Sequence, residues 1–214
     1  MSALAIAARS VEISGLATLL ACAWCLPLSL RLSTSSRGRA LRTLFLSLTS
    51  VPTVVIGLLL YLLLSSSGPL GSLSLLYTPL AVVIGQAVLV TPLMISLVME
   101  AIARVSPAIT DLALTLGASR KHLMGLLRRE ASPSIVCAVL LAFCRAVGEL
   151  GVALMLGGNI PGWTRVMSTA IALELERGEV GLCLQLAGLL LAIVLPLVFI
   201  ARRLEERRRR AARG

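Results

Sequence analysis

Two residues of opposite charge, Arg145 and Glu149, lie four positions apart in an otherwise apolar segment. This spacing puts both side chains on one face of a helix, where they can form an ion pair. Pairing is favoured because an unpaired charge at membrane depth costs at least about 2.5 to 3.5 kcal/mol. Two interpretations stay open. The arginine attracts an anion at a pathway gate or a dimer interface, or the pair is structural and locks neighbouring helices together.

Small residues accompany this pair and continue beyond it. Glycines allow helices to approach closely and then allow the chain to bend, and an asparagine can close a turn. The pattern predicts either a shaped external loop that serves as a gate or docking element, or the ordinary end of a helix. The residues concerned are Gly148, Gly151, Gly157, Gly158 and Asn159.

Residue types that support catalysis or metal binding give weak signals in this chain. Cys22 and Cys25 have the spacing of a redox pair, but nothing near them in an apolar helix would lower a thiol pKa, so a packing role is favoured. His122 has no second histidine or cysteine beside it and is expected to lie on the surface. The sequence has no glycine-rich loop ending in Gly-Lys-Ser or Gly-Lys-Thr. We therefore expect no catalytic residue, no bound metal or cofactor and no ATP hydrolysis by this chain itself.

The composition places these residues in a membrane protein. Of the 214 residues, 57% are hydrophobic, 14% are charged and 3% are aromatic, whereas soluble domains carry about 25% charged residues. The net charge of +10 comes from Lys and Arg grouped between apolar segments and in a C-terminal tail, a distribution that indicates membrane orientation and argues against nucleic-acid binding. We expect one membrane domain over residues 1–214, and the tail can touch anionic lipid headgroups.

Apolar segments predict an all-α protein with about five transmembrane helices. A bilayer core about 30 Å thick takes about 20 helical residues. Residues 43–99 carry no charge, which is too long for one helix, and the turn lies at residues 65–71. The expected spans are residues 11–31, 43–64, 77–101, 134–157 and 180–201.

The loop charges predict the orientation of these spans. Basic residues follow the first, third and fifth spans, whereas the loops after the second and fourth spans are uncharged or rich in acids. Positive loops face the cytoplasm. We expect an inner-membrane protein with its N-terminus outside and its C-terminus in the cytoplasm.

The loop between the third and fourth spans, residues 104–132, is too long for a simple connection. It predicts two short helices hinged at Gly117, with Ser119 capping the second helix over residues 120–129. The alternative is an amphipathic helix lying on the membrane surface.

Residues 111–119 resemble the coupling motif of importer permeases of the ATP-binding-cassette (ABC) class. Asp111 takes the place of the motif's glutamate, Leu112 and Ala113 of its alanines, and Gly117 of its glycine. In that family this loop sits in a groove of a separate ATPase subunit. The resemblance implies a type I ABC importer permease whose coupling residues are Asp111, Leu112, Ala113, Gly117, Ala118, Ser119 and Arg120.

A second resemblance covers residues 143–151 and 157–162, which are similar to oxyanion permeases for molybdate, tungstate and sulfate. The continuation over residues 163–174 most resembles the tungstate branch. This implies oxyanion import by a homodimer with cytoplasmic ABC ATPase subunits, which use ATP and Mg, and with an extracytoplasmic oxyanion-binding protein. Tungstate is the expected cargo, and molybdate or sulfate is the alternative. An anion channel or carrier that does not use ATP is the other alternative, whereas a membrane-embedded enzyme would need more converging acids or metal ligands than Arg145 and Glu149 provide.

Overall fold

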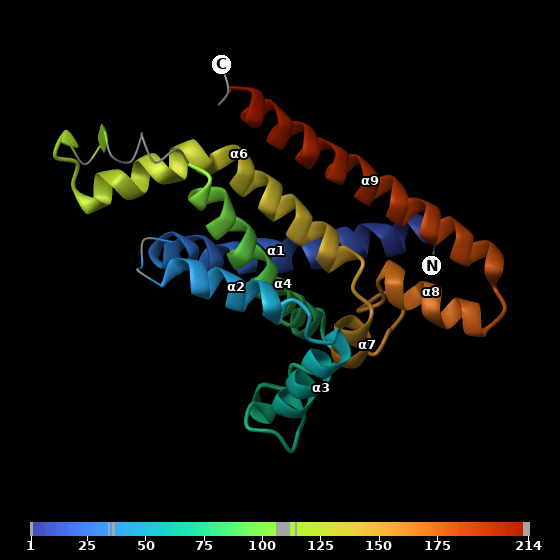
Figure 1. Cartoon of the computed structure of the whole chain (residues 1–214). Coiled ribbons are helices and arrows are strands. Elements are labelled where there is room, and N and C mark those ends of the chain that lie inside the picture. The colour runs from blue at the N-terminus through green and yellow to red at the C-terminus, as the bar shows by residue number, and fades with distance from the viewer. Residues whose placement is uncertain (1, 34, 36, 106–111, 114, 212–214) are drawn as a thin grey trace.

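A computed structural model of the chain describes residues 2–33, 35, 37–105, 112–113 and 115–211, and the regular elements in this part are all helices. The central helix is α4 (Pro79–Ala103), which contacts α1 (Ala3–Ser33), α2 (Gly38–Leu48), α6 (Arg120–Val147) and α7 (Gly151–Gly157). Two thirds of its most apolar stretch is buried, at 67%. Figure 1 shows these helices crossing as one bundle.

Helices α1 and α4 pack closely because α1 presents a line of small side chains. Ala17, Ala21 and Cys25 recur every four residues and are fully buried. Small side chains let two membrane helices approach each other. The Cys25 thiol lies 3.8 Å from the backbone oxygen of Thr91 in α4, which agrees with the packing role expected for this cysteine.

The segment predicted as one span over residues 43–64 is a broken pair of helices. Helix α2 ends at Leu48, and α3 (Thr53–Leu64) begins after a bend of 88°. Pro52 causes the break, because it has no backbone N–H and its φ of -57° with a ψ of 130° is not helical. Helix α3 leaves the bundle at the bottom of Figure 1, and the short 3-10 helix η1 (Gly71–Leu73) follows it.

The predicted division between the coupling loop and the fourth span also differs from the structure. The expected helix over residues 120–129 and the first half of the expected span over residues 134–157 form one continuous helix, α6, of 28 residues. The prediction that Ser119 caps this helix is confirmed, since its hydroxyl accepts a hydrogen bond from the His122 backbone N–H at 3.4 Å. The helix ends at Val147, and the chain turns at Gly148 before the short α7.

Two helices complete the bundle. Helix α8 (Met167–Glu176) lies in the segment predicted as an external loop, and α9 (Val180–Ala211) runs back along α8 and α6. Only 11% of the most apolar stretch of α9 is buried, so its outer side faces lipid or another chain. Four helices, α1, α4, α6 and α9, are long and apolar enough to cross a membrane, and the pair α2 and α3 makes five if it counts as one span.

The basic residues gather where α1, α4 and α9 end and α6 begins, which we name the basic end (Figure 1). Ion pairs connect three helices there: Arg42 contacts Glu100 at 2.5 Å, and Arg104 contacts both Glu100, at 3.0 Å, and Glu205. The side of the membrane that this end faces stays a prediction. Basic residues at this end are Arg31, Arg37, Arg39, Arg42, Arg104, Lys121, Arg128, Arg129, Arg202 and Arg203.

Candidate functional site

The ion pair predicted between Arg145 and Glu149 forms, although only Arg145 lies in a helix and Glu149 follows its end. Arg145 lies in the last turn of α6, and its Nη1 donates to Glu149 Oε2 at 2.6 Å. Glu149 lies in the break before α7, where its other carboxylate oxygen accepts a hydrogen bond from the Val152 backbone N–H at 3.3 Å. The carboxylate is 2% exposed, whereas the arginine side chain is 41% exposed. The pair is therefore a fixed, buried acid with a guanidinium that reaches the protein surface.

The Arg145 side chain lines a cavity of about 240 Å³ beside the break between α2 and α3. Thr49 and Thr53 flank this break, and Leu89 and Leu93 of α4 close the apolar wall. Helix α2 has 11 residues, so the cavity lies at the far end of a helix about 16 Å long that starts at the basic end. In membrane proteins irregular backbone such as this break is tolerated where it lines a cavity.

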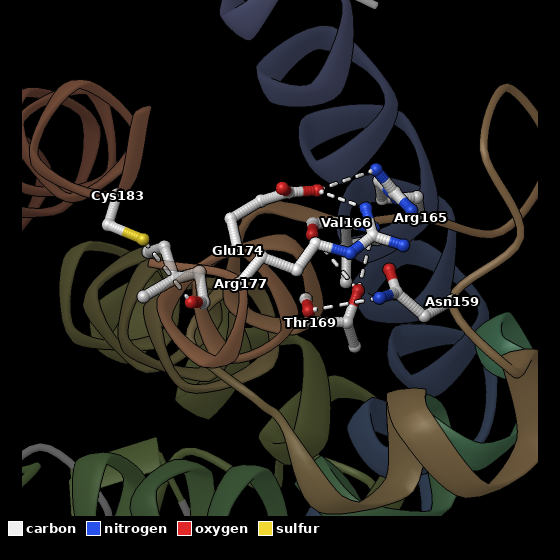
Figure 2. Close-up of polar contacts among 8 residues, drawn as sticks. Asn159, Arg165, Val166, Thr169, Glu174, Arg177 and Cys183 are labelled. Atoms are coloured by element: carbon white, nitrogen blue, oxygen red, sulfur yellow. Dashed lines mark hydrogen bonds and ion pairs between the residues drawn. The ribbon is translucent and has the colours of Figure 1, made fainter. Parts of the chain in front are cut away.

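A second polar group, which we name the loop cluster, consists of Asn159, Arg165, Thr169, Glu174 and Arg177 (Figure 2). Glu174 Oε1 accepts hydrogen bonds from Arg165 Nη1 at 3.1 Å and from Arg177 Nη1 at 3.2 Å. Asn159 Nδ2 donates to the backbone oxygen of Thr169 at 3.2 Å. All these residues except Arg177 are buried, so the loop between α7 and α8 is held in one conformation.

Further hydrogen bonds attach this loop to α1. The backbone N–H of Met167 donates to the Ser10 hydroxyl at 2.7 Å, and Arg9 donates to the backbone oxygen of Gly162 at 3.3 Å. The tip of the loop exposes Trp163, at 50%, and Ile160. A rigid loop that presents an exposed aromatic side chain is suited to contact another protein.

Some of the predicted glycine positions require glycine, because of a close contact or a positive φ, and one of them does not. Gly151 packs against the start of α3, where an added Cβ would lie 3.1 Å from Thr53 Oγ1, and Gly158 has a φ of +66°, which favours glycine. Asn159 also has a positive φ, 53°, and closes the turn as expected. Gly148 lies at the end of α6 without such a close contact.

Gly157 offers a test of this packing. Alanine at this position is expected to lower the free energy of unfolding by about 1 to 3 kcal/mol, because overpacking strains a core. The added Cβ would lie 2.8 Å from Val82 Cγ2 and 3.2 Å from Thr164 Cβ, and both side chains are β-branched and stiff. Gly148→Ala is the control, since its nearest neighbour is the Cys144 backbone oxygen at 3.6 Å. Equilibrium unfolding in mixed detergent micelles measures both, and equal losses of stability would contradict the packing argument.

The predicted coupling residues lie at the other end of α6 from Arg145. Gly117 has a φ of +76°, and the Ala118 backbone N–H donates to the Ala113 backbone oxygen at 2.9 Å, a bond that closes a helical turn before Gly117. Leu112 and Leu116 are 61% and 78% exposed. The predicted residue Asp111 lies outside the described residues, and Arg120 begins α6 with a side chain that is likewise outside the description. The chain thus places an apolar tip and a charged cavity at opposite ends of one helix.

Comparisons with known proteins agree with this architecture. Residues 17–210 match the family described as binding-protein-dependent transport system inner membrane component. A probable anion ABC transporter permease protein of Haloferax volcanii is 35% identical, with 94% of this chain and 90% of that protein covered. The tungstate uptake system permease protein of Peptoclostridium acidaminophilum is 37% identical, covering 86% and 82%. The molybdenum transport system permease protein of Escherichia coli is 30% identical, covering 79% and 80%.

Proposed function

The chain belongs to the family of binding-protein-dependent transport system inner membrane components, and we propose that it is the permease subunit of an ATP-driven importer of a tetrahedral oxyanion. Tungstate is the first candidate cargo, because a tungstate permease protein is among its similar relatives. Molybdate is the alternative on the same grounds. Sulfate is a further alternative, because a sulfate transport system permease protein is also among the similar relatives.

The observation that carries this proposal is the exposed guanidinium of Arg145, which lines the cavity beside the break between α2 and α3. A charge facing lipid inside a membrane core would cost at least about 2.5 to 3.5 kcal/mol, so within a membrane this side chain requires water or another protein chain around it. The N-terminal end of α3 also lines this cavity, and the helix dipole favours negative charge there. An arginine and a helix N-terminus on one cavity suit a passing oxyanion.

The cavity is open in a single chain, and a second copy would close it. Helix α3, whose first residues line the cavity, exposes Val54, Leu58, Leu59 and Leu62. A homodimer with two-fold symmetry would place two such faces together and put the two cavities on a shared pathway. Arg145, Gly148, Glu149 and Gly151 would then form its gate or dimer interface.

The partners follow from the two ends of α6. The exposed leucines before Gly117, with Ala113, Ala118 and Ser119, offer an apolar tip for the groove of a cytoplasmic ATPase subunit. That subunit would bind ATP and Mg, and this chain would bind no cofactor. At the opposite end, the loop carrying Gly157, Gly158 and Asn159 would receive an oxyanion-binding protein on Trp163. With these partners, the N-terminus would lie outside and the C-terminus in the cytoplasm.

The test is ATP hydrolysis by the permease reconstituted in liposomes with its candidate ATPase and binding protein. Tungstate is expected to stimulate hydrolysis at a lower concentration than molybdate or sulfate. Gly117→Val should abolish the stimulation, because a β-branched residue is strongly disfavoured at a positive φ. Gly178→Val is the matched control, since Gly178 has a φ of +79° and, like Gly117, no atom within 4 Å of an added Cβ.

The outcomes separate the parts of the proposal. Stimulation only by another oxyanion would contradict tungstate as the transported anion but would still support an ATP-driven importer. Failure to assemble with an ATPase, or anion flux without ATP, would contradict the ATP-driven importer and favour a channel or carrier. Equal loss in the two glycine variants would show that backbone strain acts on the fold instead of on the coupling.

A further inference from the structure

A second and larger cavity lies at the basic end and has no residue in common with the one that Arg145 lines. It measures about 920 Å³ and lies between the connection from α1 to α2 and the last turn of α4. Arg37, Arg39 and Arg42 line it, together with the hydroxyl-bearing Ser33, Ser35 and Thr43. The Ser33 and Thr43 hydroxyls donate to the backbone oxygens of Ser29 and Arg39, so the hydrogen-bond donors left for the cavity are the guanidinium groups and the Ser35 hydroxyl.

The charge of this cavity is not balanced by the acids of the described part of the chain. Arg42 pairs with Glu100, but Glu100 also pairs with Arg104. No ion pair is recorded for Arg37 or Arg39 among the described residues, and both side chains are exposed. The cavity therefore carries at least two guanidinium groups that are available to an anion, and guanidinium binds phosphate-type groups with paired hydrogen bonds.

The position of the cavity matches the level of lipid headgroups. Helix α1, which begins the bundle at the other end, finishes at Ser33 directly before it, and α2 returns from it with Leu44, Leu46 and Leu48 exposed. Those leucines belong in the hydrocarbon core, whereas the arginines of the first turn of α2 belong at its boundary. A lipid whose acyl chains lie against the exposed leucines would bring its phosphate to the cavity.

We propose that the cavity between the α1–α2 connection and α4 binds a tetrahedral oxyanion group through Arg37 and Arg39, supplied by the phosphate of an anionic lipid or by a free oxyanion of the cytoplasm. Arg42 has the further task of joining the cavity wall to α4 through Glu100. This binding is separate from the proposed transport activity, because it takes place at the end of the molecule and not at the Arg145 cavity. The two sources of the bound group both present a tetrahedral oxyanion and differ only in whether acyl chains are attached to it.

The experiment compares two double variants of the full chain in nanodiscs. Arg37→Gln/Arg39→Gln removes two charges from the cavity. Arg202→Gln/Arg203→Gln removes two exposed charges from α9 outside it and is the control. In one arm, nanodiscs contain phosphatidylcholine with a small fraction of phosphatidylglycerol, and native mass spectrometry after release into detergent counts the retained phosphatidylglycerol. In the other arm, nanodiscs contain only phosphatidylcholine, and isothermal titration measures binding of inorganic phosphate and tungstate.

The cavity variant is expected to bind at least about tenfold more weakly than the parent in the arm that shows binding, since losing one hydrogen bond from a guanidinium to a charged oxygen already weakens binding about tenfold. The control variant should stay close to the parent. Binding that the cavity variant loses in the first arm alone assigns a lipid, and binding that it loses in the second arm assigns a free oxyanion, whereas binding that this variant retains in full would overturn the proposal. Equal losses in both variants, or no binding in either arm, would overturn the proposal. Circular dichroism and thermal melting of the two variants, expected to match the parent, verify that neither has lost its fold.

Discussion

Replacing both members of the ion pair, Arg145→Gln with Glu149→Gln, is expected to leave the fold intact and to lower oxyanion-stimulated ATP hydrolysis at least about tenfold. A hydrogen bond to a charged group contributes about 1.5 to 3 kcal/mol, and a passing oxyanion would lose that interaction. The fold should tolerate the change because a buried ion pair is often replaceable as a unit, and the side-chain oxygen of a glutamine in place of Glu149 could still accept from the Val152 backbone N–H. The assay is the same reconstituted ATPase measurement.

The single variants distinguish the two roles that the sequence leaves open. Arg145→Gln alone leaves the Glu149 carboxylate unpaired at 2% exposure and should lower stability by about 3 to 5 kcal/mol. Arg145→Lys keeps the charge and should retain part of the activity. If the double variant regains full activity together with stability, the pair is structural and the arginine has no part in anion passage.

Replacing Glu174 with alanine is expected to lower the free energy of unfolding by about 3 to 5 kcal/mol, the usual cost of removing one partner of a buried pair. Two arginines lose their shared acceptor, and Arg165 is itself buried at 9% exposure. The Arg165 Nε already has no partner in the described structure, so no second acceptor is in place to compensate. Equilibrium unfolding in mixed detergent micelles measures the loss.

Glu176→Ala is the control for this prediction. Glu176 carries the same charge two positions after Glu174, but its side chain is exposed. It should change stability by less than about 0.5 kcal/mol, as surface substitutions usually do. Similar effects of the two substitutions would mean that net charge, and not the loop cluster, determines the difference.

The fold class was predictable because it depends on the local composition, and four or five candidate spans agree with the expected number of about five. The absence of charge over residues 43–99 required a turn, and the structure places it after α3. The Ser119 cap was predictable for a similar reason, since a cap depends on a residue and its next three neighbours.

The breaks within spans were not predicted, because hydrophobicity does not distinguish a straight helix from a bent one. Pro52 is a visible signal of the first break, but Pro92 and Pro133 lie inside continuous helices. A proline in the sequence therefore does not show by itself where a helix breaks. Neighbouring helices decide whether a proline is tolerated. Gly151 packed against Thr53 is such a contact, and the sequence does not reveal it.

The loop cluster and the ion pairs of the basic end were missed because their partners are distant or lie on different elements. Arg104 and Glu205 are 101 positions apart, and Arg165 meets Glu174 only because α8 forms in a segment read as a loop. The lack of glycine and proline over residues 167–176 was the one local signal for α8.

The continuity of α6 has a mechanical consequence. Its 28 residues form one helix with a contour length of about 40 Å, which carries the exposed tip before its first turn and Arg145 in its last. Near its midpoint the helix rests on α4 and α9, where the Cys137 thiol donates to the Ala201 backbone oxygen at 3.0 Å. Pro133 lies beside this support and removes one backbone hydrogen bond of the helix, and α6 bends along its length in Figure 1. A push on the exposed tip can therefore reach the Arg145 end as a swing of the whole helix about its support, or be taken up as a change of the bend at Pro133.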